Sequence, residues 1–412
     1  MALDLSPFGW AGLSLSLDLR DLEHSLPTWR HLNILQDATS TTLRFPNGAL
    51  TSPDVSGAYM PGYEKGMILN SKGSYSNIYK GRRTIYKCVS HVGNRMEITM
   101  SAPPHDVAIK EIYLNITKEE DNATPHTKHV AYEEEISAIL YEAVIHVLVY
   151  KSLERAGVAH YTPRMYEILA ESLPPNDSPT QITAIWFCME LLNGSTMDDY
   201  LKRVLNKSLS MRARNEAILV DFLIQCAYVL HLLQTDLRFH HRDLKLNNVY
   251  QRERPPVTRA PIALPNGQSW TPQLDLVFLD YGFSCIACGS HSRMPRSTLI
   301  GAGSWFTMDD DCCKEGRDLA QLLFSLHCEF PLTEYIGTEL YTFLIRTMTA
   351  TDGGAIIPMT NGFTVDGIPL AAGSHAIYHN GVYHFLKQNS VDIPLCKPSV
   401  FLEGLLRVRG LL

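Results

Sequence analysis

The chain has 412 residues, which at about 150 residues per domain allows two or three domains and a large core. Hydrophobic residues make up 45% and charged residues 19%, a globular composition that excludes disorder except in local segments. The net charge of -7 excludes a general basic field that would attract nucleic acid or an anionic membrane. We therefore expect no nucleic-acid partner.

The most apolar stretch, 217–233, is interrupted by Asp221 and Gln225, so we expect a buried helix and no membrane span. No basic region precedes an apolar run at the amino terminus, so no secretory signal is visible. Nine cysteines form an odd set, and several lie in apolar segments, which favours reduced thiols. These features predict an intracellular protein, in the cytoplasm or the nucleus.

The pattern of the first 190 residues predicts an extension followed by a small lobe. Residues 1–62 show no sustained period, so we predict an extension of unassigned role. From 66 to 110, strand-like runs alternate with turns, which predicts an antiparallel meander. A helical pattern follows from about Glu133 to Arg155, and two more strands are predicted before residue 190.

Beyond residue 190 the pattern becomes mainly helical. Thr196 is a candidate N-cap, and 212–233 forms the long buried helix. Residues 251–273 contain five prolines, which predicts an inserted surface loop between two strands. The fold class expected from these patterns is α+β, with a sheet-rich first part and a helical second part.

The strongest chemical signal is His-Arg-Asp-Leu-Lys-Leu-Asn-Asn at 241–248, between the buried helix and a short strand. Phosphoryl transfer needs a carboxylate that orients a hydroxyl and accepts its proton, and an amide oxygen can help to hold Mg²⁺. Asp243 and Asn248 have these side chains. The octapeptide resembles the catalytic loop of the protein kinase superfamily, with every specified position matched.

Two further segments strengthen the resemblance. Asp280 follows a buried strand and precedes Tyr281 and a glycine, similar to the metal-binding Asp-Phe-Gly of kinases. Val-Ala-Ile-Lys at 107–110 matches the kinase strand whose lysine reaches the α- and β-phosphates of ATP and pairs with a helix glutamate. The resemblance thus assigns Ala108 and Lys110 to the ATP site. The partner of Lys110 stays open between Glu142, which we prefer, and Glu135.

The chain departs from the family at the glycine-rich loop. The kinase pattern falls on 71–78, where only the middle glycine is kept. Because glycine lets backbone N–H groups approach phosphate closely, we expect the two serines to weaken or reshape this clamp. An ordinary hairpin turn is the alternative. The resemblance assigns ATP contacts in this loop to Ser71, Gly73, Ser76 and Ile78.

The segment 186–194 resembles the fifth strand and hinge of kinases. This implies that Met189 is the gatekeeper, and that the Glu190 carbonyl and the Leu192 amide contact adenine. A strand end with a turn is the alternative. Downstream, Asp318 resembles the aspartate that braces the kinase catalytic loop, whereas the Ala-Pro-Glu signature of the kinase substrate platform is absent.

The resemblance implies a bilobal protein kinase fold, with an antiparallel-sheet N-lobe at 63–190, including one long helix, and a mainly helical C-lobe at 191–412. Lys245, two residues after Asp243, is typical of serine/threonine kinases and would neutralise charge on the transferred phosphoryl group. The implied reaction transfers the γ-phosphoryl group of ATP to a hydroxyl of a protein substrate. Mg²⁺, or Mn²⁺ in its place, would be held by Asn248 and Asp280.

Two other functions are weighed against this one. A pseudokinase scaffold would bind nucleotide or partner proteins with little turnover, but all four polar catalytic residues are present. A small-molecule phosphotransferase of kinase-like fold would usually carry His-Gly-Asp, whereas this chain has His-Arg-Asp. The insertions and the thinned glycine loop resemble the divergent kinases of large DNA viruses, which implies action in a host cell.

Overall fold

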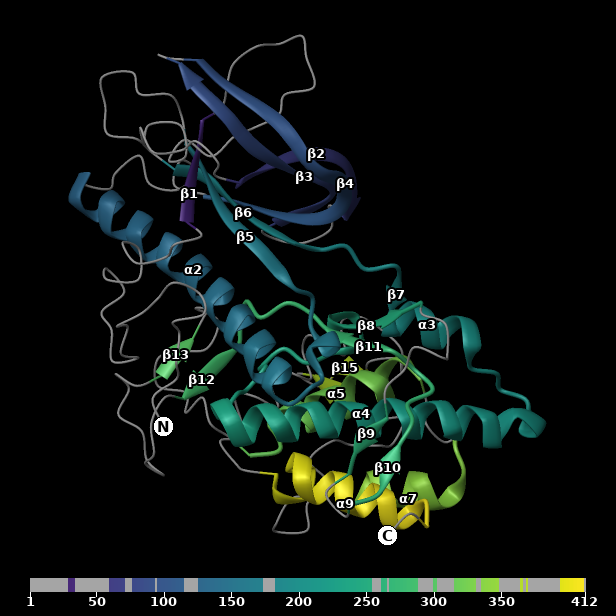
Figure 1. Ribbon diagram of the computed structural model, residues 1–412. Helices are drawn as coiled ribbons and strands as arrows, with labels where there is room; N and C mark the ends of the chain where they lie inside the picture. Colours follow the sequence, from purple (N-terminus) through teal and green to yellow (C-terminus); the bar gives the residue numbers. More distant parts are fainter. Residues whose placement is uncertain are drawn as a thin grey trace. The chain divides into compact units, whose positions relative to one another are not determined.

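The computed structural model is α+β, as predicted, with six α-helices and one large sheet among the described residues (Figure 1). It divides into two compact units. The first, here called the sheet unit, comprises 1–147, 163–192 and 289–298, and the second, the helical unit, comprises 148–162, 193–288 and 299–412. The structure describes residues 29–33, 59–70, 76–92, 95–114, 125–172, 182–253, 261–264, 267–287, 299–301, 315–330, 335–347, 364–365, 368–369 and 393–410.

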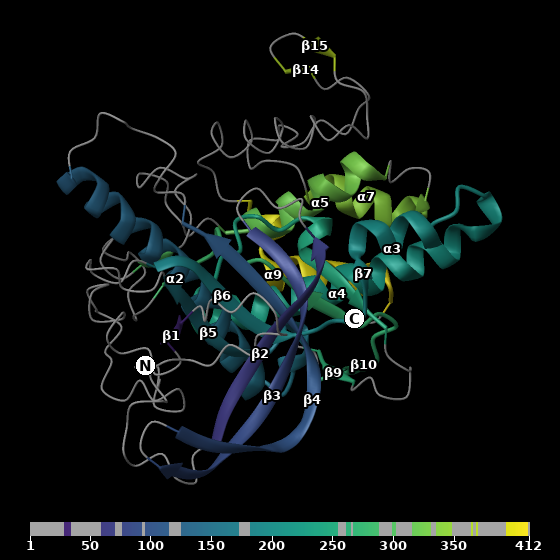
Figure 2. The ribbon, with the colours of Figure 1, turned by 90° about the horizontal axis from the view of Figure 1, so that it is seen from above.

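The sheet unit contains six strands in the order β1-β5-β6-β4-β3-β2. Each neighbouring pair among β2 to β6 is antiparallel, and β2, β3 and β4, which run side by side in Figure 2, form the meander predicted for 66–110. Their bounds are β1 Trp29–Asn33, β2 Tyr59–Asn70, β3 Ser76–Val92, β4 Arg95–Tyr113, β5 Met165–Ser172 and β6 Ile182–Glu190.

Strand β1 lies within 1–62, where the sequence shows no sustained period. It pairs in parallel with β5, with Trp29 opposite Ile168. Its five residues, Trp-Arg-His-Leu-Asn, do not alternate between apolar and polar types, so the sequence carries no strand pattern here. Ladder hydrogen bonds come from the backbone and therefore need no side-chain pattern.

Strand β4 is longer than predicted, because it continues through Pro103 and Pro104. Proline lacks the N–H that a ladder needs. The pairing with β3 shifts register here, between the pairs Arg83–His105 and Ile85–Ala102. The two prolines therefore lie at a β-bulge, where the ladder is already interrupted.

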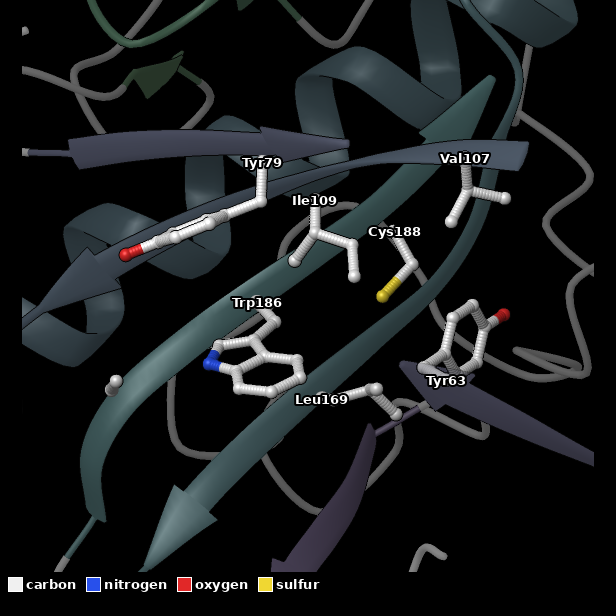
Figure 3. Packing of buried hydrophobic residues seen from close by; sticks show 8 residues of the cluster. Tyr63, Tyr79, Val107, Ile109, Leu169, Trp186 and Cys188 are labelled. Atoms are coloured by element: carbon white, nitrogen blue, oxygen red, sulfur yellow. The ribbon is translucent and has the colours of Figure 1, made fainter. Parts of the chain in front are cut away.

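Alternation along β4 separates the buried core from the candidate site. Val107 and Ile109 are fully buried in an apolar cluster with Trp186 (Figure 3). Because side chains alternate between the two faces of a strand, Ala108 and Lys110 belong to the opposite face. Helix α2, Pro125–Arg155, meets Lys110 on that face through Glu142. The core cluster consists of Tyr63, Tyr79, Val107, Ile109, Leu169, Ala184, Trp186 and Cys188.

The helical unit is built around α4, Arg212–Leu237, against which α9, Pro398–Val408, packs (Figure 1). The other helices are α3 Met197–Val204, α5 Arg317–Glu329 and α7 Thr338–Thr347, and short 3-10 turns lie at η3 Ala159–Tyr161, η4 Leu209–Met211, η5 Leu246–Asn248 and η8 Pro394–Cys396. A small antiparallel sheet is formed by β7 Gly194–Thr196, β8 Val249–Arg252 and β11 Leu276–Phe278. Three strand pairs complete the described part of the unit: β9 Ile262–Ala263 with β10 Ser269–Trp270, β12 Cys285–Ala287 with β13 Leu299–Gly301, and β14 Thr364–Val365 with β15 Ile368–Pro369.

The predicted N-cap of α3 is present, since Thr196 Oγ1 accepts a hydrogen bond from the Asp199 amide (3.2 Å).

The apolar helix α4 carries one carboxylate, Asp221, within its buried stretch, and hydrogen bonds explain its presence there. The side chain is fully buried and accepts hydrogen bonds from the amides of Gln273 (2.9 Å) and Leu274 (2.8 Å) and from Trp270 Nε1 (3.0 Å). These donors anchor the end of the predicted insertion on α4. Among the described residues, one helical segment, 209–237, is long and apolar enough to span a membrane, and 78% of its apolar window is buried inside the protein.

Candidate active site

In the sheet unit, β4 places Lys110 opposite Ile78 of β3 and Phe187 of β6. Lys110 Nζ lies 2.5 Å from Glu142 Oε1, and their side chains are only 14% and 12% exposed. Because the Lys110 side chain has little access to solvent, its charge-assisted hydrogen bond to Glu142 holds it in place. Of the two glutamates left open by the sequence, the structure thus places Glu142 against Lys110. Glu135 lies two helical turns earlier, about 10 Å along the axis of α2.

His146 follows Glu142 by one turn of α2 and is buried. Its Nε2 lies 2.8 Å from the carbonyl oxygen of Pro163. Burial lowers the pKa of His146 to about 4, and the positive charge of Lys110 adds to this effect. The imidazole is therefore neutral at pH 7 and adds no positive charge beside Lys110.

The other predicted ATP contacts in the sheet unit are only partly described. Ser71 and Gly73 lie outside the described residues. Ser76 and Ile78 begin β3, where Ile78 is the cross-strand neighbour of Lys110. Ala108 of β4 lies opposite Met189 of β6, so the structure brings these two predicted residues together. Glu190 is the last residue of β6, and Leu192 lies in the following coil.

In the helical unit, two of the predicted site residues, Lys245 and Asn248, converge on the carboxylate of Asp243. Lys245 Nζ lies 2.7 Å from Asp243 Oδ2, and Asn248 Nδ2 donates to the same oxygen (3.0 Å) and to the Asp243 carbonyl (2.8 Å). The Asp243 side chain is 18% exposed. The loop therefore presents one oriented carboxylate with partial access to solvent.

The backbone of this loop is held by Asp318 at the start of α5. Asp318 Oδ2 accepts a hydrogen bond from the His241 amide and Oδ1 accepts one from the Arg242 amide, both at 2.8 Å. Arg242 has a φ of 64°, a left-handed conformation that a non-glycine residue adopts only when its surroundings impose it. Asp318 supplies that constraint, as the resemblance implied.

The segment that carries Asp280 is tied to the same loop. The Leu279 amide donates to the Asn248 carbonyl (2.9 Å), and the Leu279 carbonyl lies 3.0 Å from His241 Nε2. Asp280 itself is exposed and has a φ of 60°, a left-handed conformation like that of Arg242. Tyr281 packs its ring against His241, with ring centroids 5.7 Å apart.

The oxygen atoms of Asn248 and Asp280 are ligands of the kind that Mg²⁺ binds. This ion usually takes only one or two protein carboxylates, and its other ligands come from phosphate and water. Both hydrogen bonds of the Asn248 side chain come from its amide nitrogen, so among the described residues its Oδ1 accepts none and is available as a ligand. Asp280 supplies an exposed carboxylate. The described residues contain no cluster of three His, Cys, Asp or Glu side chains suited to a metal, and an ion bound mainly by phosphate needs none.

Sequence reasoning missed two residues that support this site. Ser325 Oγ accepts a hydrogen bond from the Leu246 amide (3.2 Å), and the Thr162 hydroxyl contacts Tyr281 (2.8 Å). In each pair the two residues lie far apart in the chain, and an isolated serine or threonine carries no recognisable sequence pattern. Only the folded structure brings them to the site.

The sequence matches none of the protein-family models, and none of the curated proteins to which it was compared matches it.

Proposed function

We propose that this protein is a serine/threonine protein kinase, in which the sheet unit is the N-lobe and the helical unit is the C-lobe of a bilobal kinase fold. The observation that carries the proposal is the arrangement at Asp243. Its carboxylate is fixed by Lys245 (2.7 Å) and Asn248 (3.0 Å), on a loop whose backbone is held by the buried Asp318. A mere surface turn would not need this degree of order.

In the proposed reaction, the hydroxyl oxygen of a substrate serine or threonine forms a bond to the γ-phosphorus of ATP. The bond between the γ-phosphorus and the bridging β–γ oxygen breaks, and ADP leaves. Asp243 orients the hydroxyl and accepts its proton. Lys245 places its positive charge next to this centre, where negative charge develops on the transferred group.

Two further groups serve ATP in this proposal. Lys110, kept in place by Glu142, would contact the α- and β-phosphates, as its match to the kinase strand implies. Asn248 and Asp280 would hold Mg²⁺, which would neutralise phosphate charge when bound. Mn²⁺ prefers the same oxygen ligands and would substitute.

The test is transfer of labelled phosphate from ATP to generic basic and acidic proteins. Asp243→Asn and Lys110→Met should each reduce transfer at least 100-fold. The surface pair Lys80–Asp106 (2.7 Å) provides matched controls, because Lys80→Met and Asp106→Asn change the same residue types on an exposed face. Label on serine or threonine, lost in the first two variants alone, supports the kinase. ATP binding without any transfer by the unmodified chain contradicts it and supports the pseudokinase scaffold.

A further inference from the structure

The hydroxyl of Tyr281 makes a buried hydrogen bond that phenylalanine could not make. It lies 2.8 Å from Thr162 Oγ1 and 3.3 Å from the Phe278 carbonyl oxygen. Tyr281 and Thr162 are each 1% exposed. Burial raises the pKa of Tyr281, so its hydroxyl keeps its proton and can donate at neutral pH.

The ring of Tyr281 is held independently of this hydroxyl. Its centroid lies 5.7 Å from that of His241 and 6.0 Å from that of Phe239, the latter in an edge-to-face arrangement. Phenylalanine would make the same ring contacts. The hydrogen bond to Thr162 depends on the tyrosine hydroxyl and is therefore separate from the packing of the ring.

The two neighbours of Asp280 are thus fixed from two directions. Leu279 is hydrogen-bonded to the catalytic loop through Asn248 and His241. Tyr281 is hydrogen-bonded to Thr162, which follows η3. Between them, Asp280 keeps a φ of 60°, a left-handed conformation that a non-glycine residue holds only when its surroundings maintain it.

We propose that the Tyr281–Thr162 hydrogen bond is a positioning contact that holds the Asp280 turn in its left-handed conformation and thereby sets the apparent affinity for the divalent metal. The inference rests on the proposed kinase function, because it assigns the metal to Asp280. Tyr281 and Thr162 act through Asp280 and do not themselves contact the reacting groups.

The first experiment measures phosphate transfer as a function of Mg²⁺ at saturating ATP. Tyr281→Phe and Thr162→Val should each raise the Mg²⁺ concentration for half-maximal rate about threefold to tenfold, the worth of one buried hydrogen bond. The double variant should be about as impaired as Tyr281→Phe alone, because both single substitutions remove the same Tyr281–Thr162 hydrogen bond. Thr162→Ser keeps the hydroxyl and should restore the normal Mg²⁺ dependence. Tyr228→Phe, in α4, is the control for loss of a tyrosine hydroxyl elsewhere in the unit.

The second experiment separates this inference from the kinase function. Amide hydrogen exchange over 279–287 should quicken in Tyr281→Phe and Thr162→Val but not in Thr162→Ser or Tyr228→Phe. If the unmodified chain transfers no phosphate, the kinase proposal fails, while the exchange rates still test the contact. Normal exchange in Tyr281→Phe overturns the inference. An active enzyme whose Mg²⁺ dependence is unchanged in both variants overturns it as well.

Discussion

Asp318 and Arg242 are joined by a hydrogen bond of 2.8 Å from the Arg242 amide to the Asp318 carboxylate, although 76 residues separate them in the chain. Asp318 is 1% exposed, and the bond belongs to a residue with a φ of 64°. The conformation of the loop that carries Asp243 therefore depends on the first turn of α5. Substitutions at this residue should report directly on that dependence.

Asp318→Asn should lower both activity and stability. Asparagine keeps one acceptor oxygen but turns an NH₂ group toward the second backbone donor, so one buried amide loses its partner. We expect a loss of about 2 kcal/mol in the free energy of unfolding, measured in urea, and at least a tenfold loss of phosphate transfer. Asp199→Asn, on the exposed start of α3, is the control. Normal transfer by Asp318→Asn would show that the loop does not need this brace.

Glu142→Gln and Glu135→Gln should differ sharply, although both residues lie on α2. The first change removes the negative partner of Lys110 at 2.5 Å, whereas the second leaves that pair intact. We expect kcat/KM for ATP to fall at least tenfold in Glu142→Gln and less than twofold in Glu135→Gln. Equal losses in the two variants would mean that the Lys110–Glu142 pair has no special role.

His146 should make stability depend on pH. Its pKa is about 4 in the folded protein, below its ordinary value of 6.5, so the unfolded chain binds the extra proton first as pH falls. The stabilisation is therefore complete above pH 6.5 and is lost progressively between pH 6.5 and 4, by up to about 3 kcal/mol. His146→Gln can still donate to the Pro163 carbonyl but does not titrate. Urea unfolding at pH 7 and pH 4.5 should show a smaller loss in the variant, and parallel losses would refute the assignment.

Asp221→Ala should destabilise the helical unit without touching the candidate site. It removes the acceptor of the Gln273 and Leu274 amides and of Trp270 Nε1 inside the protein. Each buried donor without a partner costs about 1–3 kcal/mol, so we expect a loss of at least 3 kcal/mol. Trp270 fluorescence during urea unfolding gives the measurement. A loss below 1 kcal/mol would show that the insertion is not anchored through Asp221.

Much of the site could be predicted because its residues lie in short, contiguous patterns. The alternation around Lys110 and the order of residues 241–248 are visible in the sequence itself. The choice between Glu142 and Glu135 could not be made in this way, since both residues fit a helix, and only the place where α2 meets β4 decides which glutamate contacts the lysine.

Other features depend on contacts that leave no pattern in the chain. The pairing of β1 with β5 joins segments more than 130 residues apart, and the bulge at Pro103 and Pro104 depends on the register of β3. The bond between Tyr281 and Thr162 joins residues 119 positions apart. Each of these follows from tertiary structure, which the local pattern does not encode.

The most direct test of the central claim is to compare Asp243→Asn with the unmodified chain in both ATP binding and phosphate transfer. The substituted asparagine keeps the size of the side chain but cannot accept the hydroxyl proton. The account predicts a fall in kcat of at least 100-fold with an unchanged Kd for ATP, while Asp106→Asn behaves normally. An unmodified chain that binds ATP but transfers no phosphate, or an Asp243→Asn variant with normal kcat, would contradict it.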